Sequence, residues 1–167
     1  MLFVQTKMKN KILNRLSFGF TLVELLVVIT IIAILTGLSV SSYTSAQIKA
    51  RDSQRKSDLD QISKALMLYY ADTGVFPASF SFGNSSTGFV GNNGIIYMRQ
   101  TPKDPRKGYS YVYKVSVDLK QFNIFANLEN RNDSQCQQDS NGLGMYSVDG
   151  IKYCYGVSSP NTVVKSW

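Results

Sequence analysis

The chain has 167 residues and no histidine, a length that suits one modest domain with one additional element. It therefore lacks the most common general base and the most common metal ligand of proteins. Its formal net charge is +7, but four basic residues precede the first apolar run, and the rest of the chain has 14 basic and 11 acidic residues. Those four, which indicate an N-terminus in the cytoplasm rather than a nucleic-acid-binding surface, are Lys7, Lys9, Lys11 and Arg15.

The remaining sequence contains no recognisable catalytic pattern. There is no cysteine spacing typical of a metal site and no phosphate-binding loop. We therefore expect a protein that is not an enzyme and needs no cofactor, with a membrane-tethered enzyme as the remote alternative.

The first apolar run extends over residues 20–40 and contains a single charged residue, Glu24. A helix of 21 residues spans roughly 30 Å, which matches the hydrocarbon core of a bilayer. The run therefore predicts one membrane helix with its N-terminus inside. An ordinary secretory signal, cleaved near Ser39, is the alternative, but Glu24 inside the run and Gly19 just before it argue against that.

A helical pattern continues beyond the apolar run, because residues 41–72 contain neither proline nor glycine. Thr73-Gly74 gives a stop signal. A single helix from Phe20 to Thr73 would be about 80 Å long, too long to be buried in so small a domain. Its first half must contact lipid or other subunits, and its second half must carry the domain. The second half has an apolar stripe of Leu59, Ile62, Leu66 and Tyr69, and an opposite polar face of Arg55, Lys56, Asp58, Asp60 and Lys64.

The C-terminal part of the chain shows the alternating pattern of half-buried strands. We predict strands at 109–117, 122–128 and 151–157, with a turn at 118–120, a loop at 78–94 and a polar, turn-rich segment at 129–150. The apolar face of a small antiparallel sheet needs a cover, and the stripe that begins at Leu59 is the helix surface available for it.

The predicted fold class is therefore α+β: a long N-terminal helix, half membrane-spanning and half amphipathic, packed on a small antiparallel β-sheet. The predicted domains are a basic leader at 1–19, a membrane helix at 20–40, its amphipathic continuation at 41–74, and a β-rich domain at 75–167.

The two cysteines, Cys136 and Cys154, both lie near the C-terminus. An even number of cysteines on the outer side of a membrane predicts a disulfide. Two buried free thiols are the alternative.

Gly19-Phe20-Thr21-Leu22-Val23-Glu24, followed by LLVVITIIAIL, resembles the class III signal of type IV pilins and type II secretion pseudopilins. The resemblance implies the type IV pilin fold, cleavage after Gly19 by a dedicated membrane peptidase, and methylation of the new N-terminal residue, Phe20. A carboxylate near the end of a membrane helix seeks a cation. The resemblance implies that Glu24 finds it in the amine of a neighbouring subunit and so drives filament assembly. In the alternative interpretation, Glu24 reaches the membrane interface.

A second resemblance covers the middle of the chain. Residues 68–77 and the segment Pro102-Lys103-Asp104-Pro105, followed by Gly108-Tyr109-Ser110-Tyr111, are similar to major pseudopilins. Arg106 stands where that family usually has tryptophan, so the resemblance does not separate a pilin from a pseudopilin. Many relatives have proline where Ser41-Ser42 stands here, which makes Gly37 the expected point of helix loosening.

Two further sets of residues suggest ligands. Oxygen ligands clustered in a turn suit calcium, and the resemblance implies a calcium site in a nearby loop, but a solvated loop is the preferred interpretation of Asp133, Asp139, Asn141 and Asp149.

Basic side chains on the second half of the helix could contact DNA phosphates. Acidic residues interleave with them, so we expect no nucleic-acid partner for Lys49, Arg51, Arg55, Lys56 and Lys64.

The sequence thus favours a structural subunit of a type IV pilus-like filament, a homo-oligomer that depends on prepilin peptidase and on a pilus or secretion assembly platform. The expected location is the cytoplasmic membrane as a single-pass precursor, then the cell surface. A major pseudopilin of a type II secretion system is the first alternative. A monomeric, membrane-tethered adhesin is the alternative of another class.

Overall fold

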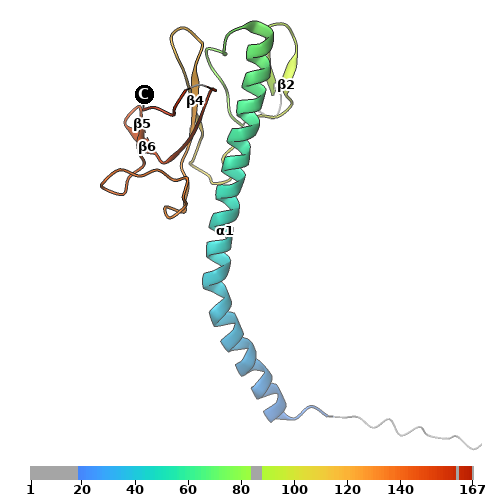
Figure 1. Ribbon diagram of the computed structural model, residues 1–167. Coiled ribbons are helices and arrows are strands. Elements are labelled where there is room, and N and C mark those ends of the chain that lie inside the picture. The colour runs from blue at the N-terminus through green and yellow to red at the C-terminus, as the bar shows by residue number, and fades with distance from the viewer. Residues whose placement is uncertain (1–18, 84–87, 161, 167) are drawn as a thin grey trace, which may run out of the picture. The chain divides into compact units, whose positions relative to one another are not determined.

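The computed structural model describes residues 19–83, 88–160 and 162–166, without the side chains of residues 38–41. Within this part of the chain, one helix is followed by seven short strands (Figure 1). The chain forms two compact units, residues 1–41 and 42–167, which we describe separately. The predicted leader, except Gly19, lies outside the described residues.

The predicted long helix is confirmed as α1 (Leu22–Thr73), which continues through Gly37. Its C-terminal end follows from glycine chemistry. Gly74 has a φ of 74°, a conformation that favours glycine, and its N–H donates to the carbonyl of Tyr70 at 2.8 Å. This is a helix-ending arrangement of the kind that Thr73-Gly74 predicts.

The apolar stripe of α1 is also confirmed, since Leu59, Ile62, Leu66 and Tyr69 are all buried. The first three belong to a core cluster that includes Phe122 and Ile124 from the sheet. Burial of a large apolar side chain stabilises a fold by roughly 1.5–3 kcal/mol, so this stripe is the main attachment between helix and sheet.

The predicted polar face of the helix is not exposed throughout, because Arg55 and Asp58 are buried together with Asp52. The guanidinium of Arg55 is fully buried and pairs with Asp52 at 2.7 Å, with Asp104 at 2.9 Å and with Glu129 at 2.8 Å. Although burial opposes the charged form, the hydrogen bonds that Arg55 donates to Asp104, Glu129 and Asp52 raise its pKa. We call Asp52, Arg55, Asp104 and Glu129 the Arg55 cluster.

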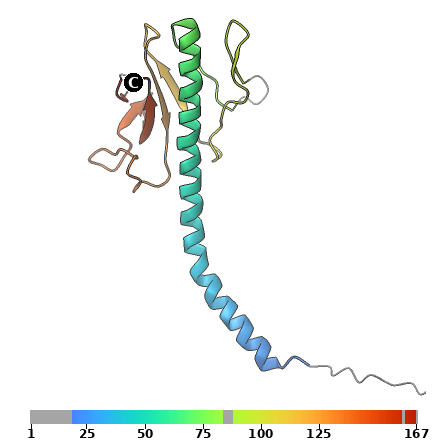
Figure 2. The ribbon, with the colours of Figure 1, turned by 45° about the vertical axis from the view of Figure 1, so that its right-hand side comes forward.

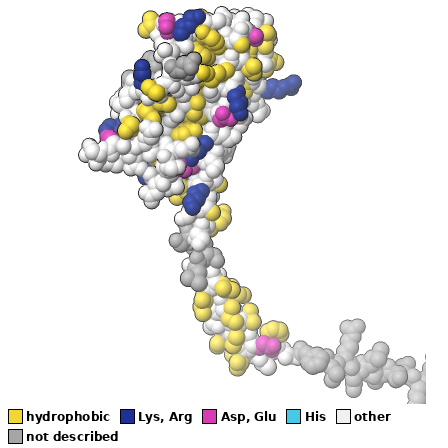
Figure 3. Space-filling view, viewed as in Figure 1, with side chains coloured by type: hydrophobic (Ala, Val, Ile, Leu, Met, Phe, Trp, Pro, Cys, Tyr) yellow, Lys and Arg dark blue, Asp and Glu magenta, His cyan; other side chains and the backbone are white. Residues whose placement is uncertain are grey.

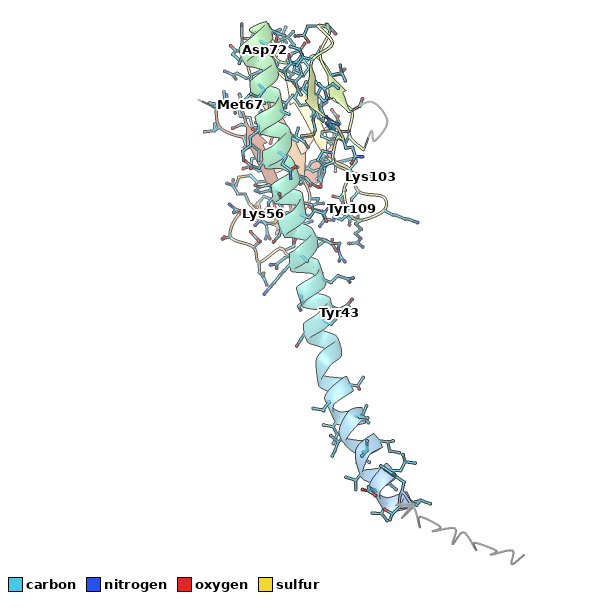
Figure 4. All side chains as sticks on the ribbon, turned by 90° about the vertical axis from the view of Figure 1, so that its right-hand side faces the viewer. Tyr43, Lys56, Met67, Asp72, Lys103 and Tyr109 are labelled. Carbon is cyan, nitrogen blue, oxygen red and sulfur yellow. A yellow bond between two sulfur atoms is a disulfide. The ribbon has the colours of Figure 1, made fainter. Side chains whose placement is uncertain are left out.

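Loop segments cover the side of α1 that carries the Arg55 cluster. The helical period of the sequence does not reveal this cover. Figure 4 shows Lys103 and Tyr109, on the loop that carries Asp104, on the same side of the helix. Arg106, at the usual tryptophan position, lies over the ring of Tyr109 at 4.8 Å and pairs with Glu129 at 3.2 Å. Lys64 remains solvent-exposed, as predicted for the polar face.

Unlike the carboxylates of the Arg55 cluster, Asp58 accepts its side-chain hydrogen bond from a neutral hydroxyl. Tyr111 donates to its carboxylate at 2.7 Å. Burial raises the pKa of Asp58, and the hydrogen bond from Tyr111 only partly opposes this. Burial, followed by the hydrogen bond to Asp58, also raises the pKa of Tyr111.

The described strands form three antiparallel sheets. The central sheet has the order β3-β4-β7, and two hairpins, β1-β2 and β5-β6, accompany it. Figure 2 shows the central sheet and hairpin β1-β2 on different sides of the C-terminal half of α1. The bounds are β1 (Phe89–Val90), β2 (Ile96–Met98), β3 (Val112–Val115), β4 (Phe122–Ala126), β5 (Tyr146–Val148), β6 (Ile151–Tyr153) and β7 (Tyr155–Ser158).

Three details of the strand prediction are wrong. β1 lies in the predicted loop 78–94, and β5 lies in the predicted polar segment 129–150. The predicted strand 151–157 is split at Cys154 into β6, which pairs with β5, and β7, which pairs with β4. Strands of two or three residues are too short to show the alternation on which the prediction rested.

Strand β4 is buried along its entire length, although the alternation predicted one buried face. Phe122 and Ile124 join the core cluster that includes the helix stripe. Phe125 belongs to a second cluster with Tyr146 and Tyr153. Successive side chains of a strand point to opposite faces. The hairpin β5-β6 therefore covers the face of β4 that carries Phe125, for which the sequence predicted no cover.

Candidate processing and assembly site

The start of α1 has a side-chain cap. The N–H of Glu24 donates to Oγ1 of Thr21 at 3.2 Å, and Oγ1 of Thr21 donates to Oε2 of Glu24 at 3.5 Å. The sequence Thr-x-x-Glu is the capping-box signature of a helix N-terminus. This signature marks Thr21 in the sequence as the helix cap, and it was not among the predicted features. Glu24 therefore has a local partner at the helix start.

Gly19 and Phe20 precede α1 and are exposed. Phe20 is 74% exposed, and a Cβ placed on Gly19 would have no atom within 4 Å. The bond between these residues is thus in non-helical, accessible backbone, as a peptidase requires. The structure places the predicted cleavage and methylation residues together with Glu24 at one end of α1.

The surface of α1 that follows the cap is apolar and exposed (Figure 3). By length and composition this part of the helix could cross a membrane, and none of it is buried within the protein. Among the described side chains of this unit, the exposed large apolar ones are Phe20, Leu22, Val23, Leu25, Leu26, Val27, Val28, Ile29, Ile31, Ile32, Ile34 and Leu35.

Two hydroxyls on this apolar surface are satisfied within the helix. Thr30 donates to the carbonyl of Val27, and Thr36 donates to the carbonyl of Ile32, each at 2.7 Å. Since an unpaired hydroxyl is costly in an apolar medium, these bonds adapt the helix to lipid or to other helices. Glu24 is the one charged side chain between residues 19 and 37.

The predicted disulfide is present between Cys136 and Cys154, with a Cα–Cα distance of 4.7 Å. Both cysteines are buried, in a small cluster with Leu128. The N–H of Gln137 donates to the carbonyl of Cys154 at 2.7 Å. The disulfide therefore fastens the polar segment to the chain where β6 ends and β7 begins.

Three of the four calcium candidates have lysine partners, in different places. Asp133 pairs with Lys56 at 2.7 Å, Asp149 pairs with Lys114 at 2.9 Å, and Asp139 pairs with Lys152. Hydrogen bonds from these lysines lower the pKa values of Asp133 and Asp139. Asn141 shares a turn with Asp139, to whose carboxylate its N–H donates.

Among the described residues, no group of three or more acidic, cysteine or histidine side chains is placed to hold a metal ion. The structure thus does not bring the four calcium candidates into one ligand set, and the predicted solvated loop, with calcium binding as its alternative, stays a prediction.

The basic side chains considered for DNA do not form one free face. Arg55 is buried, and three of the others pair with carboxylates, as Arg51–Glu129, Lys56–Asp133 and Lys64–Asp60. Hydrogen bonding from Arg51 lowers the pKa of Glu129 to about 2. The pairs of Arg51 and Lys56 attach the helix to loops of the folded unit, whereas Lys64–Asp60 lies within the helix.

Comparisons with known proteins agree with the geometry at the start of α1. Residues 14–40 match the family described as the prokaryotic N-terminal methylation motif. Searches of curated proteins and of solved structures find no match. The matched range contains Gly19, Phe20 and Glu24, and the motif implies processing by prepilin peptidase. It does not distinguish a pilus subunit from a secretion pseudopilin. The chain thus carries a prepilin-type N-terminal methylation motif with one membrane-anchoring helix, consistent with the type IV pilin and pseudopilin family.

Proposed function

We propose that the mature chain, cleaved between Gly19 and Phe20, is a structural subunit of a type IV pilus-like filament. The observation that carries the proposal is the exposed apolar surface of α1 up to residue 37, with one charge near its start. Lipid covers such a surface in the precursor. Outside the membrane, helices of other copies must cover it, because a large exposed apolar surface is unfavourable in water.

Glu24 gives this association a register. Cleavage creates an amine on Phe20, one helical turn from Glu24. The cap with Thr21 supplies hydrogen bonds but no positive charge. A carboxylate in an apolar surrounding is stabilised when a cation is desolvated with it. The amine of Phe20 in a neighbouring copy is a suitable cation.

The partners follow from this assignment. They are further copies of the chain, prepilin peptidase and the assembly platform of a pilus or of a related secretion machine. The subunit begins in the cytoplasmic membrane and ends in a filament at the cell surface, without enzymatic activity. A major pseudopilin of a type II secretion system would share this processing and helix, and the genes beside its own would distinguish the two machines.

The experiment compares three variants expressed in place of the native chain. Glu24→Ala removes the charge and the capping contact, whereas Glu24→Gln removes the charge and keeps a residue that completes a capping box. Thr21→Ala removes the cap and keeps the charge. Filaments are sheared from the cells and quantified by immunoblot against the membrane fraction.

We expect both Glu24 variants to be inserted in the membrane and strongly depleted from filaments. We expect Thr21→Ala to assemble, because its loss of capping costs only about 1 kcal/mol. Normal filament yield from Glu24→Gln would refute the role of the charge. If Glu24→Ala and Thr21→Ala are depleted from filaments and Glu24→Gln is not, the role of Glu24 is helix capping instead.

A further inference from the structure

Beside the C-terminal end of α1, the folded unit has a cleft of about 420 Å³. Its walls come from the helix, from the segment that follows it, and from strand β1 with its turn. Figure 1 shows the hairpin of β2 next to this end of α1. The side chains that characterise the cleft are Tyr69, Ser79, Phe80, Ser81, Phe89 and Asn92.

One wall of the cleft is aromatic. The ring of Phe89 lies 5.4 Å from that of Tyr69 and 5.1 Å from that of Phe80. Tyr97 packs on both Tyr69 and Phe89, and its hydroxyl donates to Asp72 at 2.8 Å. These contacts hold Tyr69 and Phe89 in place, and Phe80 and Phe89 remain half-buried rather than fully covered.

The rim of the cleft is polar and uncharged. Ser79, Ser81 and Asn92 are exposed, and within residues 19–83, 88–160 and 162–166 no hydrogen bond occupies their side chains. None of the described residues that line the cleft is acidic or basic. The cleft therefore offers flat apolar rings and several neutral hydrogen-bonding groups, but no partner for a charged ligand.

We propose that this cleft binds a neutral saccharide of one or two rings. A sugar presents a face of C–H groups that packs on an aromatic ring, and hydroxyls that bond to serine and asparagine. The volume is in the range of small-molecule sites. A purely apolar ligand would leave the polar rim without partners, which is unfavourable, and an anionic ligand would find no cation.

The glycines of this region keep the cleft wall thin and closely packed. Gly88 has a φ of 62°, and a Cβ there would lie 2.2 Å from the carbonyl oxygen of Met98. At Gly91 a Cβ would lie 2.7 Å from the ring of Tyr97. Because neither position accepts a side chain, β1 and its turn pack closely on β2, which fixes the wall of the cleft that carries Phe89.

The test uses the full mature chain in micelles of a zwitterionic detergent, because sugar-based detergents would compete for the cleft. Saturation-transfer difference NMR is recorded with lactose, maltose, cellobiose and chitobiose, with sialyllactose as a charged saccharide, and with a polyproline peptide. We expect at least one neutral disaccharide to receive saturation on the C–H protons of one ring face.

The variants Asn92→Ala and Ser81→Ala each remove one rim group without touching the core. Loss of one hydrogen bond should raise the dissociation constant of the best disaccharide about fivefold to tenfold. The control Asn141→Ala removes an exposed loop asparagine outside the cleft and should leave the constant unchanged. Phe80→Ala should abolish binding, with near-ultraviolet circular dichroism showing whether the fold is intact.

The proposal is overturned if no neutral disaccharide receives saturation, or if binding is unaffected in both Asn92→Ala and Ser81→Ala. Binding of the polyproline peptide alone would assign the cleft to a peptide partner and overturn the saccharide assignment as well. The test is independent of filament assembly, because the cleft lies entirely within residues 42–167.

Discussion

The Arg55 cluster allows a quantitative test of how the folded unit is attached to its helix. Arg55→Met replaces a fully buried guanidinium with an apolar side chain of similar length. Removing one partner of a buried ion pair costs about 3–5 kcal/mol, because the remaining charges stay buried without compensation. Asp52 and Asp104 are at most 5% exposed, so both carboxylates would stay buried without their arginine partner.

The remaining hydrogen bonds place the expected cost at the lower end of this range. Asp104 still accepts from the N–H of Arg106, and Asp52 still accepts from the N–H of Glu129 and of Asn130. We therefore expect a loss of about 3 kcal/mol in the free energy of unfolding. For a unit of this size, that loss lowers Tm by roughly 10 °C.

The assay is thermal unfolding of the detergent-solubilised chain, followed by circular dichroism at pH 7 and pH 3. The matched control is Lys64→Met, which breaks the exposed pair with Asp60 and should change stability by less than about 0.5 kcal/mol. In the native chain Glu129 has a pKa of about 2, so its contribution is complete above about pH 4.5 and is lost as the pH falls towards 2.

Because Arg55 helps to lower the pKa of Glu129, the deficit of Arg55→Met should be smaller at pH 3 than at pH 7. If the variant melts within about 2 °C of Lys64→Met, or if its deficit is the same at both pH values, the cluster does not attach the domain as we infer.

Three further expectations address processing, the disulfide and the buried carboxylate that lacks a cation. Gly19→Val should accumulate as the uncleaved precursor, because a Cβ hinders close approach of the backbone to the peptidase, and a mature mass in the mass spectrum would exclude this site. Reduction of Cys136–Cys154, which closes a loop with a sequence separation of 18, should cost roughly 3 kcal/mol, measured as a lower Tm with reductant, and an unchanged Tm would contradict it. Asp58 has a raised pKa, so its charge destabilises the fold above that pKa and the penalty disappears as the pH falls. Asp58→Asn should therefore be at least as stable as the native chain at pH 7, with its advantage shrinking towards pH 4, and a large loss at pH 7 would show that Tyr111 requires the carboxylate.

The sequence alone was sufficient for features whose causes are local. The helix from Leu22 to Thr73 was predictable because a long run without proline, an apolar period and Gly74 act within a few residues of one another. The stripe from Leu59 to Tyr69 was predictable for the same reason. The disulfide followed from compartment and cysteine number, and the prepilin-type signal from a short contiguous motif.

Only the tertiary structure decided which polar residues of the helix are buried and which strands pair. Arg55 contacts Asp104 and Glu129, which are 49 and 74 positions away in the chain, and no periodicity of the helix encodes those partners. The second buried face of β4 depends on a hairpin, β5-β6, that is too short to leave an alternating pattern. The saccharide cleft likewise joins Tyr69 of the helix to Phe89 of a two-residue strand. Such contacts arise when distant segments fold over the helix, and their physical cause lies in the packed unit rather than in any local stretch of sequence.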